Sequence, residues 1–205
     1  MKIALLGNSQ YNFSRVYTDE VMKKLSSLGE LSPRISKENI KNYKEFLNGC
    51  EIAFSTWGMP CFTEEEIREY MPDLKMLFYS AGSVQAFAKP FLNCGVRVFS
   101  AFAANAVPVA EYTFSQIVLA TKGFYQASKR FRLAFPSAVK FGNSTPGNFG
   151  TKIGLVGLGS IGSMVAERLQ SLDVEVLAYD PFVSRQKAED LGVKLVSLEE
   201  LFREC

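Results

Sequence analysis

The chain of 205 residues contains no histidine. The side chain that most often acts as a general base or a zinc ligand is therefore missing. Its absence excludes Ser-His-Asp and Cys-His nucleophile systems and every metal site that needs an imidazole. Cysteine is scarce as well, because the four cysteines stand far apart and form no C-x-x-C pair. We therefore expect neither a zinc knuckle nor a redox dithiol, and we assign no catalytic or metal-binding residue within the chain.

Long hydrophobic runs and an excess of one charge are also missing. No stretch approaches the roughly 18 apolar residues that a membrane-spanning helix needs, and the first apolar run reaches polar residues too soon for a signal peptide. Lys plus Arg number 23 against 21 Asp plus Glu, and this net charge of +2 gives no reason to expect a nucleic-acid or membrane partner. With few, scattered cysteines and no leader, we expect a cytoplasmic protein with reduced thiols.

The apolar residues of the first half alternate between short runs and helical spacing. The short runs predict buried strands at residues 3–7, 50–57, 75–79 and 96–100. Between them, a helical pattern ends at Gly29, and a capping box at residues 63–66 opens a second helix. Alternation of this kind predicts an α/β fold in which helices cover both faces of a parallel sheet.

The second half begins with a long helical pattern. It starts at Pro108, runs to about Leu133 and is predicted to break near Gly123. Residues 135–150 are rich in Gly, Pro, Asn and Ser and predict a loop. The remaining pattern predicts strands at 152–156 and 174–179 and helices at 161–172 and 198–202.

Residues 157–162 read Gly-Leu-Gly-Ser-Ile-Gly, a G-x-G-x-x-G motif between a predicted strand and a predicted helix. In such a motif Gly157 permits a tight turn, Gly159 lets the backbone approach a pyrophosphate, and Gly162 lets the helix pack close to its strand. The free N–H groups at the helix start, near Ser160 and Ile161, then face the phosphates at the positive end of the helix dipole. The motif predicts a dinucleotide-binding βαβ unit.

Asp180 stands at the end of the next predicted strand. Its carboxylate can accept hydrogen bonds from both ribose hydroxyls and would repel a 2′-phosphate, so we expect NAD rather than NADP. Arg185 is close enough in sequence to leave NADP as a minor alternative. A glycine-rich turn that binds nothing and a methyltransferase-type nucleotide loop are the other interpretations of the motif.

Three stretches of sequence carry a resemblance to a known family. They are Asn-Ala-Val-Pro-Val-Ala-Glu at 105–111, Gly-Thr-Lys-Ile-Gly-Leu-Val at 150–156 ahead of the glycine motif, and Tyr-Asp-Pro at 179–181. In this order they resemble the NAD-dependent D-isomer-specific 2-hydroxyacid dehydrogenases. The resemblance implies a flavodoxin-like substrate-side domain over residues 1–102. It also implies an incomplete Rossmann domain that binds NAD over residues 103–205.

The resemblance also implies substrate-binding residues. The loop of Gly82, Ser83 and Val84 matches the place where family members bind the substrate carboxylate through backbone N–H groups. Many members have Gly-x-Gly-Val-Asp where this chain has Ala-Gly-Ser-Val-Gln, and an ordinary strand–helix turn is the alternative. Asn105 matches an asparagine at the edge of the cleft, or is simply a residue of a helix start. Trp57 is expected either to form the outer wall of the substrate pocket or simply to pack against neighbouring side chains at a strand end.

For the complete protein, the resemblance implies reversible hydride transfer between nicotinamide and a 2-hydroxy or 2-oxo acid. It also implies a homodimer through the helix that starts near Pro108, with Phe114, Val118 and Tyr125 as its apolar stripe. A non-catalytic, dinucleotide-responsive interaction or regulatory module is the alternative.

The arginine, glutamate and histidine that family members use in catalysis lie in the second part of the nucleotide domain, which this chain does not contain. We expect a third strand of that domain to begin only after Cys205. The chain as given is thus expected to be inactive: a piece of a complete dehydrogenase, a deliberately shortened chain or a natural truncated paralogue.

Overall fold

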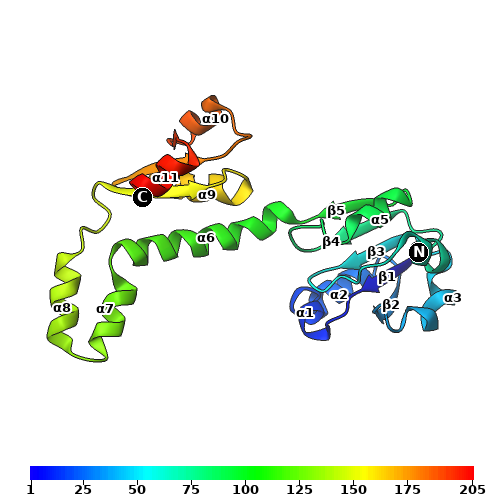
Figure 1. The fold of residues 1–205 in the computed structure, drawn as a ribbon. Helices are drawn as coiled ribbons and strands as arrows, with labels where there is room; N and C mark the ends of the chain where they lie inside the picture. The colour runs from blue at the N-terminus through cyan, green and yellow to red at the C-terminus, as the bar shows by residue number, and fades with distance from the viewer. The chain divides into compact units, whose positions relative to one another are not determined.

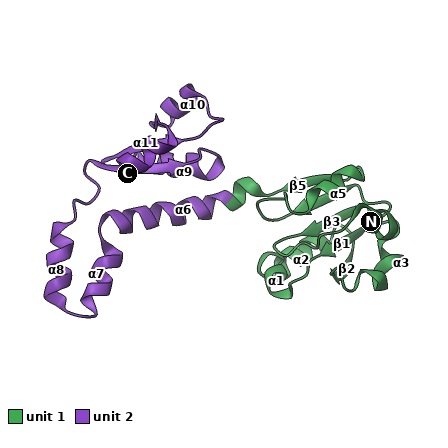
Figure 2. Cartoon of the chain, in the orientation of Figure 1, with its two compact units in different colours: residues 1–105 green, residues 106–205 purple.

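The computed structural model describes all 205 residues and divides them into two compact units, residues 1–105 and 106–205 (Figures 1 and 2). Each unit combines helices with a parallel sheet, which confirms the predicted α/β class. No helix combines the length and the apolar content that crossing a membrane requires.

Unit 1 contains a five-stranded parallel sheet in the order β2-β1-β3-β4-β5, the order of flavodoxin-like folds. Its strands are β1 (Lys2–Leu6), β2 (Glu30–Ile35), β3 (Ile52–Ser55), β4 (Met76–Tyr79) and β5 (Arg97–Ser100). The sequence predicts all of them except β2. That strand lies at the edge of the sheet and contains Pro33, and the pairing register shifts between Ile3 and Leu5 of β1. A proline in a strand is tolerated at such an edge, but it obscures the pattern.

Helices cover both faces of this sheet. They are α1 (Gln10–Val16), α2 (Asp19–Ser26), α3 (Lys44–Leu47), α4 (Glu64–Tyr70) and α5 (Ala88–Asn93), with a short 3-10 helix η1 (Ile40–Tyr43). Alternate residues of β1 enter separate cores: Ile3 and Leu5 belong to the core that includes α1 and α2, and Ala4 and Leu6 to the core that includes α3, α4 and α5. The capping box at Thr63 is present as predicted.

Unit 2 contains a three-stranded parallel sheet in the order β6-β7-β8. Its strands are β6 (Thr151–Val156), β7 (Val174–Tyr179) and β8 (Lys194–Leu195), with helices α9 (Ser160–Leu169), α10 (Arg185–Asp190) and α11 (Leu198–Glu204). The expectation that a third strand begins only after Cys205 is wrong, because β8 already pairs with β7. Two residues of strand are too few to give a readable alternation.

The three helices that follow β5 and precede β6 along the chain differ most from the prediction. They are α6 (Phe102–Thr121), α7 (Phe124–Phe131) and α8 (Phe135–Ser144). The first begins at Phe102 rather than at Pro108, so Pro108 lies inside it. The predicted break is present at Gly123, which has φ +65°. Phe114 packs against the core of unit 2, so it is not free for the apolar stripe that the sequence predicts.

The predicted loop at 135–150 is wrong over most of its length, because α8 occupies residues 135–144. Pro136 stands in the first turn of the helix, where its missing N–H removes no intrahelical hydrogen bond. The helix lies beside α7 in an antiparallel hairpin, and the Arg130 guanidinium stacks over the Phe141 ring at 4.6 Å (Figure 1). Proline, glycine and asparagine are therefore compatible with a helix that has a neighbour to pack on.

Candidate functional site

The glycine motif forms the turn between β6 and α9. Gly157 has φ +94°, a backbone conformation that residues with a side chain rarely adopt. A Cβ on Gly162 would lie 2.0 Å from the Gly157 carbonyl oxygen, so any side chain there would collide with the turn. A Cβ on Gly159 would meet no atom within 4 Å. Two glycines are thus required by the turn itself, whereas Gly159 leaves open space in front of the helix.

That open space is bordered by unpaired backbone donors. The N-cap of α9, Gly159, provides no side-chain hydrogen bond. The amide groups of Gly159, Ser160 and Ile161 donate to no acceptor, and the first bond of this turn runs from the Ser163 amide to the Gly159 carbonyl. A helix N-terminus of this kind favours an anion, because its unpaired N–H groups carry the positive end of the helix dipole. The residues present fit a dinucleotide pyrophosphate.

Asp180, at the end of β7, lies against the same turn. Its carboxylate accepts hydrogen bonds from the amides of Leu158 at 2.7 Å, Phe182 at 2.8 Å and Val183 at 3.1 Å. These bonds, that from Leu158 most of all, lower the pKa of Asp180, with a further contribution from Lys187. The group is therefore ionised and fixed in direction, as a ribose-binding carboxylate must be. Sequence reasoning identified Asp180 but missed its bond to the glycine turn.

In unit 1 the loop after β4 contains a second set of unpaired amides. The N–H groups of Gly82, Ser83 and Val84 donate to no acceptor in the structure. Ser100, at the end of β5, fixes this loop, because its hydroxyl donates to the carbonyls of Ala81, at 3.0 Å, and Gly82. Successive N–H groups held in this way can bind a carboxylate without a charged side chain.

Asn105 lies beside this loop. A Cβ on Gly82 would stand 3.0 Å from its side-chain nitrogen, and the Asn105 side chain makes no hydrogen bond. The structure thus brings together the substrate residues that the resemblance implies, although Asn105 stands in the first turn of α6 rather than ahead of a helix starting at Pro108. Trp57 follows β3 and is 43% exposed.

Tyr17 contacts the start of the loop that follows β4, and the sequence did not predict this role. Its buried hydroxyl donates to the Ser55 carbonyl at 2.8 Å and lies 2.9 Å from the Ser80 hydroxyl. Because the Ser55 carbonyl can only accept, the Ser80 hydroxyl is the donor in the second bond. Burial raises the pKa of Tyr17 to about 12, and the bond to Ser80 opposes the rise. No local sequence signal marks a tyrosine that connects a helix end to two strand ends.

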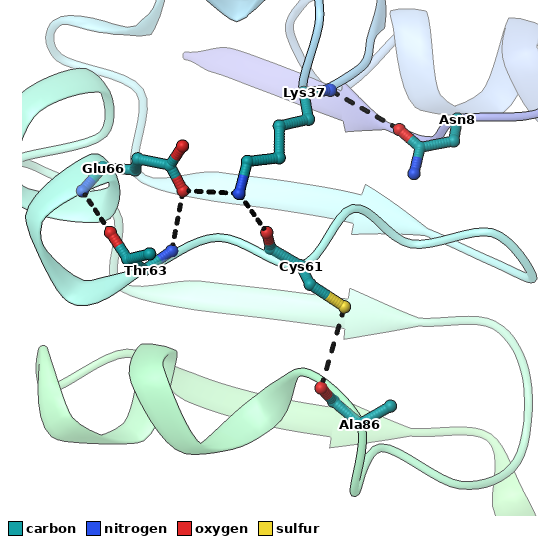
Figure 3. A network of polar contacts seen from close by, with 6 residues as sticks. All are labelled: Asn8, Lys37, Cys61, Thr63, Glu66 and Ala86. Carbon is teal, nitrogen blue, oxygen red and sulfur yellow. Dashed lines mark hydrogen bonds and ion pairs between the residues drawn. The ribbon is translucent and has the colours of Figure 1, made fainter.

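Lys37 of unit 1 forms an ion pair and a hydrogen bond within its own unit (Figure 3). The Lys37 ammonium lies 3.0 Å from the Glu66 carboxylate and donates to the Cys61 carbonyl at 2.9 Å. The same carboxylate accepts from the Thr63 amide at 2.8 Å, and this bond, followed by Lys37, lowers the pKa of Glu66. The Cys61 thiol approaches the Ala86 carbonyl at 3.7 Å. This network fixes the loop between β3 and α4.

Comparisons with known proteins identify a matching family for the second half of the chain. Residues 115–205 match the family described as D-isomer specific 2-hydroxyacid dehydrogenase, NAD binding domain. The D-3-phosphoglycerate dehydrogenase of Archaeoglobus fulgidus is 35% identical over 113 residues, covering 52% of this chain and 20% of the relative. That of Bacillus subtilis is 31% identical over 107 residues, again 52% of this chain and 20% of the relative. The matched region therefore spans about a fifth of these curated relatives.

Solved structures resemble the whole chain in fold. The phosphoglycerate oxidoreductase of Rhizobium etli superposes with a TM-score of 0.70 at 22% identity, covering 98% of this chain and 62% of that one. The D-mandelate dehydrogenase of Rhodotorula graminis gives 0.72 at 17% identity, covering 99% and 63%. The NAD-dependent formate dehydrogenase of Staphylococcus aureus, solved with NAD, gives 0.65 at 22% identity, covering 98% and 62%.

The parallel sheet of unit 2 and the glycine turn between β6 and α9 have the arrangement of a Rossmann-type domain. Residues 115–205 match the NAD-binding domain of the D-isomer specific 2-hydroxyacid dehydrogenase family, which confirms, for this part of the chain, the resemblance drawn from the sequence. Because the family describes an NAD-binding domain, NAD is also confirmed as the predicted cofactor.

Proposed function

We propose that this chain forms the substrate-side domain and the first part of the NAD-binding domain of a D-2-hydroxyacid dehydrogenase. The complete protein catalyses reversible hydride transfer between nicotinamide and a 2-hydroxy or 2-oxo acid. The observation that carries this proposal is the family match of residues 115–205. The matched region contains the glycine turn with its unpaired amides and the adjacent, ionised carboxylate of Asp180.

In the nucleotide-binding domain, residues 103–205, the amides of Gly159, Ser160 and Ile161 bind the pyrophosphate. Gly157 and Gly162 give the turn its shape. Asp180 binds the ribose hydroxyls and disfavours a 2′-phosphate, so NADH binds more tightly than NADPH. The lowered pKa of Asp180 supports this role, because the carboxylate stays charged at neutral pH. NAD supplies the hydride chemistry of the reaction.

In the substrate-side domain, residues 1–102, the amides of Gly82, Ser83 and Val84 bind the substrate carboxylate. Asn105 adds a side-chain amide that has no partner within its unit and lies close to Gly82. The proposal rests on these N–H groups, which the fold holds in position and which have no hydrogen-bond acceptor within the protein. Recognition of an anion by the backbone requires this arrangement.

The complete protein forms a homodimer through the region of α6 to α8. This region exposes many apolar side chains: Tyr112, Phe124, Tyr125, Phe131, Leu133 and Phe135. Exposed apolar side chains of this size and number are typical of an interface between subunits. Light scattering of the complete protein at micromolar concentration should show a dimer, and a monomer would contradict the assignment.

All four cysteines are free thiols, which supports a cytoplasmic location.

The nucleotide-binding proposal is tested by calorimetric titration of the 205-residue chain with NADH. Gly159→Trp places an indole in the open space before α9 and should abolish binding. Gly142→Trp is the matched control, because Gly142 also has no atom within 4 Å of its Cβ position but lies in α8, away from the motif.

The wild type and the control should bind NADH, with NADH preferred over NADPH. Equal affinity for the two dinucleotides would contradict the role of Asp180. Equal loss in both tryptophan variants, or no NADH binding by the wild type, would contradict the proposed site.

A further inference from the structure

The charges of the chain are unevenly distributed along its sequence. Residues 112–166 contain six Lys and Arg and no Asp or Glu, although the whole chain has a net charge of only +2. One of the six, Lys152, pairs with Glu204 at 2.6 Å. Four of the others belong to the hairpin of α7 and α8 and the residues that join them: Lys129, Arg130, Arg132 and Lys140. The hairpin is therefore a purely basic part of the molecule.

These four cations have no acidic partner in the structure. No ion pair of the chain includes any of them. Arg130 stacks over the Phe141 ring at 4.6 Å, and Lys129, Arg132 and Lys140 are exposed. A surface with charges of one sign attracts a partner of the opposite sign. The hairpin thus favours an anionic partner.

The same hairpin contains an apolar groove between its two helices. The groove has a volume of about 460 Å³ and is lined by Ala127, Ser128, Phe131, Arg132, Ala138 and Val139. Two of its apolar side chains, Phe131 and Val139, are 60% and 43% exposed. Because α7 and α8 pack mainly on each other, no further helix of the chain covers the groove (Figure 1). Exposed apolar surface of this kind marks a site of interaction.

We propose that this groove binds an acidic amphipathic helix of another protein. The apolar stripe of the partner helix covers Phe131 and Val139 and lies along α7 and α8. Acidic residues beside that stripe pair with Arg132, in the groove itself, and with Lys129 and Lys140, each next in sequence to a groove residue. The inference goes beyond the proposed function and does not depend on it.

Other occupants fit this groove less well. A second copy of the chain would bring the same cations against one another, with no carboxylate between them. The proposed homodimer has other apolar surface available, on the exposed side chains of Val107, Val109 and Tyr112 in α6. A phosphate backbone would meet the cations, but it has no apolar side chains to fill the groove.

Fluorescence anisotropy of labelled model peptides tests the proposal with the 205-residue chain. The Glu peptide has about 15 residues, enough to form a helix on binding, with Leu at helical spacing and Glu at most other positions. In the Lys peptide every Glu is replaced by Lys, and a scrambled peptide keeps the composition without the Leu stripe. The Glu peptide should bind saturably and about tenfold or more tightly than either control. Equal binding of a control peptide, or no binding of the Glu peptide, would overturn the proposal.

An exchange of charge locates the binding surface. The double variant Lys129→Glu, Arg132→Glu should lose the Glu peptide and bind the Lys peptide instead. The matched control is Lys23→Glu, Lys41→Glu, which changes the net charge equally at two exposed positions of unit 1 and should behave as the wild type. Unchanged binding of the Glu peptide by the hairpin variant, or equal loss in both variants, would overturn the proposal.

Two single variants test the apolar part of the groove. Phe131→Ser should weaken binding of the Glu peptide about tenfold, whereas Phe202→Ser, at a 75% exposed position outside the hairpin, should not change it. Both variants should keep the melting temperature and the NADH affinity of the wild type, which distinguishes a lost groove from unfolding. A dimer of the chain that Phe131→Ser dissociates would assign the groove to a second copy and overturn the proposal. Binding of phosphatidylserine vesicles or a DNA oligonucleotide, without binding of the Glu peptide, would overturn it as well.

Discussion

At the scale of single residues, the glycines of the motif have separable roles. Gly162→Ala should destabilise the chain by about 1–3 kcal/mol, because overpacking of this order follows when a Cβ is forced against backbone, here 2.0 Å from the Gly157 oxygen. Gly159→Ala should leave the melting temperature unchanged and weaken NADH binding, because its Cβ projects into the space proposed for the pyrophosphate. Thermal unfolding and calorimetry measure the two effects. The reverse assignment, with Gly159 structural and Gly162 neutral, would contradict the geometry.

The sequence predicts these residues because their chemistry is local. A G-x-G-x-x-G turn is determined by neighbouring backbone atoms, so Gly157 to Gly162 and Asp180 are recognisable without a structure. The roles of Leu158, Ser100 and Tyr17 could not be predicted, because each depends on a partner brought near only by the fold. Positioning residues of this kind have no spacing rule.

At the scale of elements, Tyr17 connects the end of α1 to the ends of β3 and β4, and this connection depends on pH. The pKa of Tyr17 is raised from its ordinary 10.0 to about 12 in the folded protein, chiefly by burial. Its neutral form is favoured by folding, so the stabilisation is complete below pH 10 and is lost as pH rises toward about 12. Urea unfolding of the wild type should show this loss between those two pH values.

Tyr17→Phe should remove the pH dependence and cost about 1–2 kcal/mol at neutral pH, because two buried hydrogen bonds are lost. Tyr11→Phe is the control, since that tyrosine is 71% exposed. A wild type and a Tyr17→Phe variant with the same alkaline decline would contradict the account.

The hairpin of α7 and α8 depends on the turn at Gly123. Gly123→Ala should destabilise this hairpin by about 1–2 kcal/mol, because a non-glycine residue with positive φ is strained. Its Cβ would also stand 2.6 Å from the Thr145 methyl carbon and 2.9 Å from the Phe141 ring. Hydrogen exchange of the α7 and α8 amides measures the change. Gly142→Ala, in a helix with free space, should slow exchange instead, and faster exchange in both variants would contradict the distinction.

The elements that the sequence failed to predict are those whose secondary structure depends on contacts with an adjacent strand or helix. Strand β8 has two residues and β2 contains a proline, so neither shows an alternation, and both exist because an adjacent strand supplies hydrogen bonds. The glycines and prolines of residues 135–150 predict a loop, yet packing on α7 makes α8 a helix. Long, regular patterns, such as β6, α9 and β7, were predicted nearly to their ends because burial on one face determines them.

At the scale of the whole molecule, the proposed sites supply binding but no proton donor. Hydride transfer to a carbonyl leaves an alkoxide, and a positioned general acid contributes about 100 to 10,000-fold to such a step. The chain has no histidine, Asp180 is ionised, and Tyr17 is buried with its pKa raised to about 12. We expect no NADH oxidation by the 205-residue chain with a panel of 2-oxo acids. Chain-dependent turnover that Gly159→Trp abolishes would show that a proton donor was overlooked.

The central claim is that the turn between β6 and α9 binds a nicotinamide dinucleotide. The most direct measurement is the set of backbone amide NMR signals of the ¹⁵N-labelled chain during titration with NADH. The account predicts that the signals of Gly159, Ser160 and Ile161 shift and saturate together, while those of Gly82 to Val84 stay in place. Saturable shifts confined to other residues, or none at the glycine turn at NADH concentrations that saturate known dehydrogenases, would contradict it.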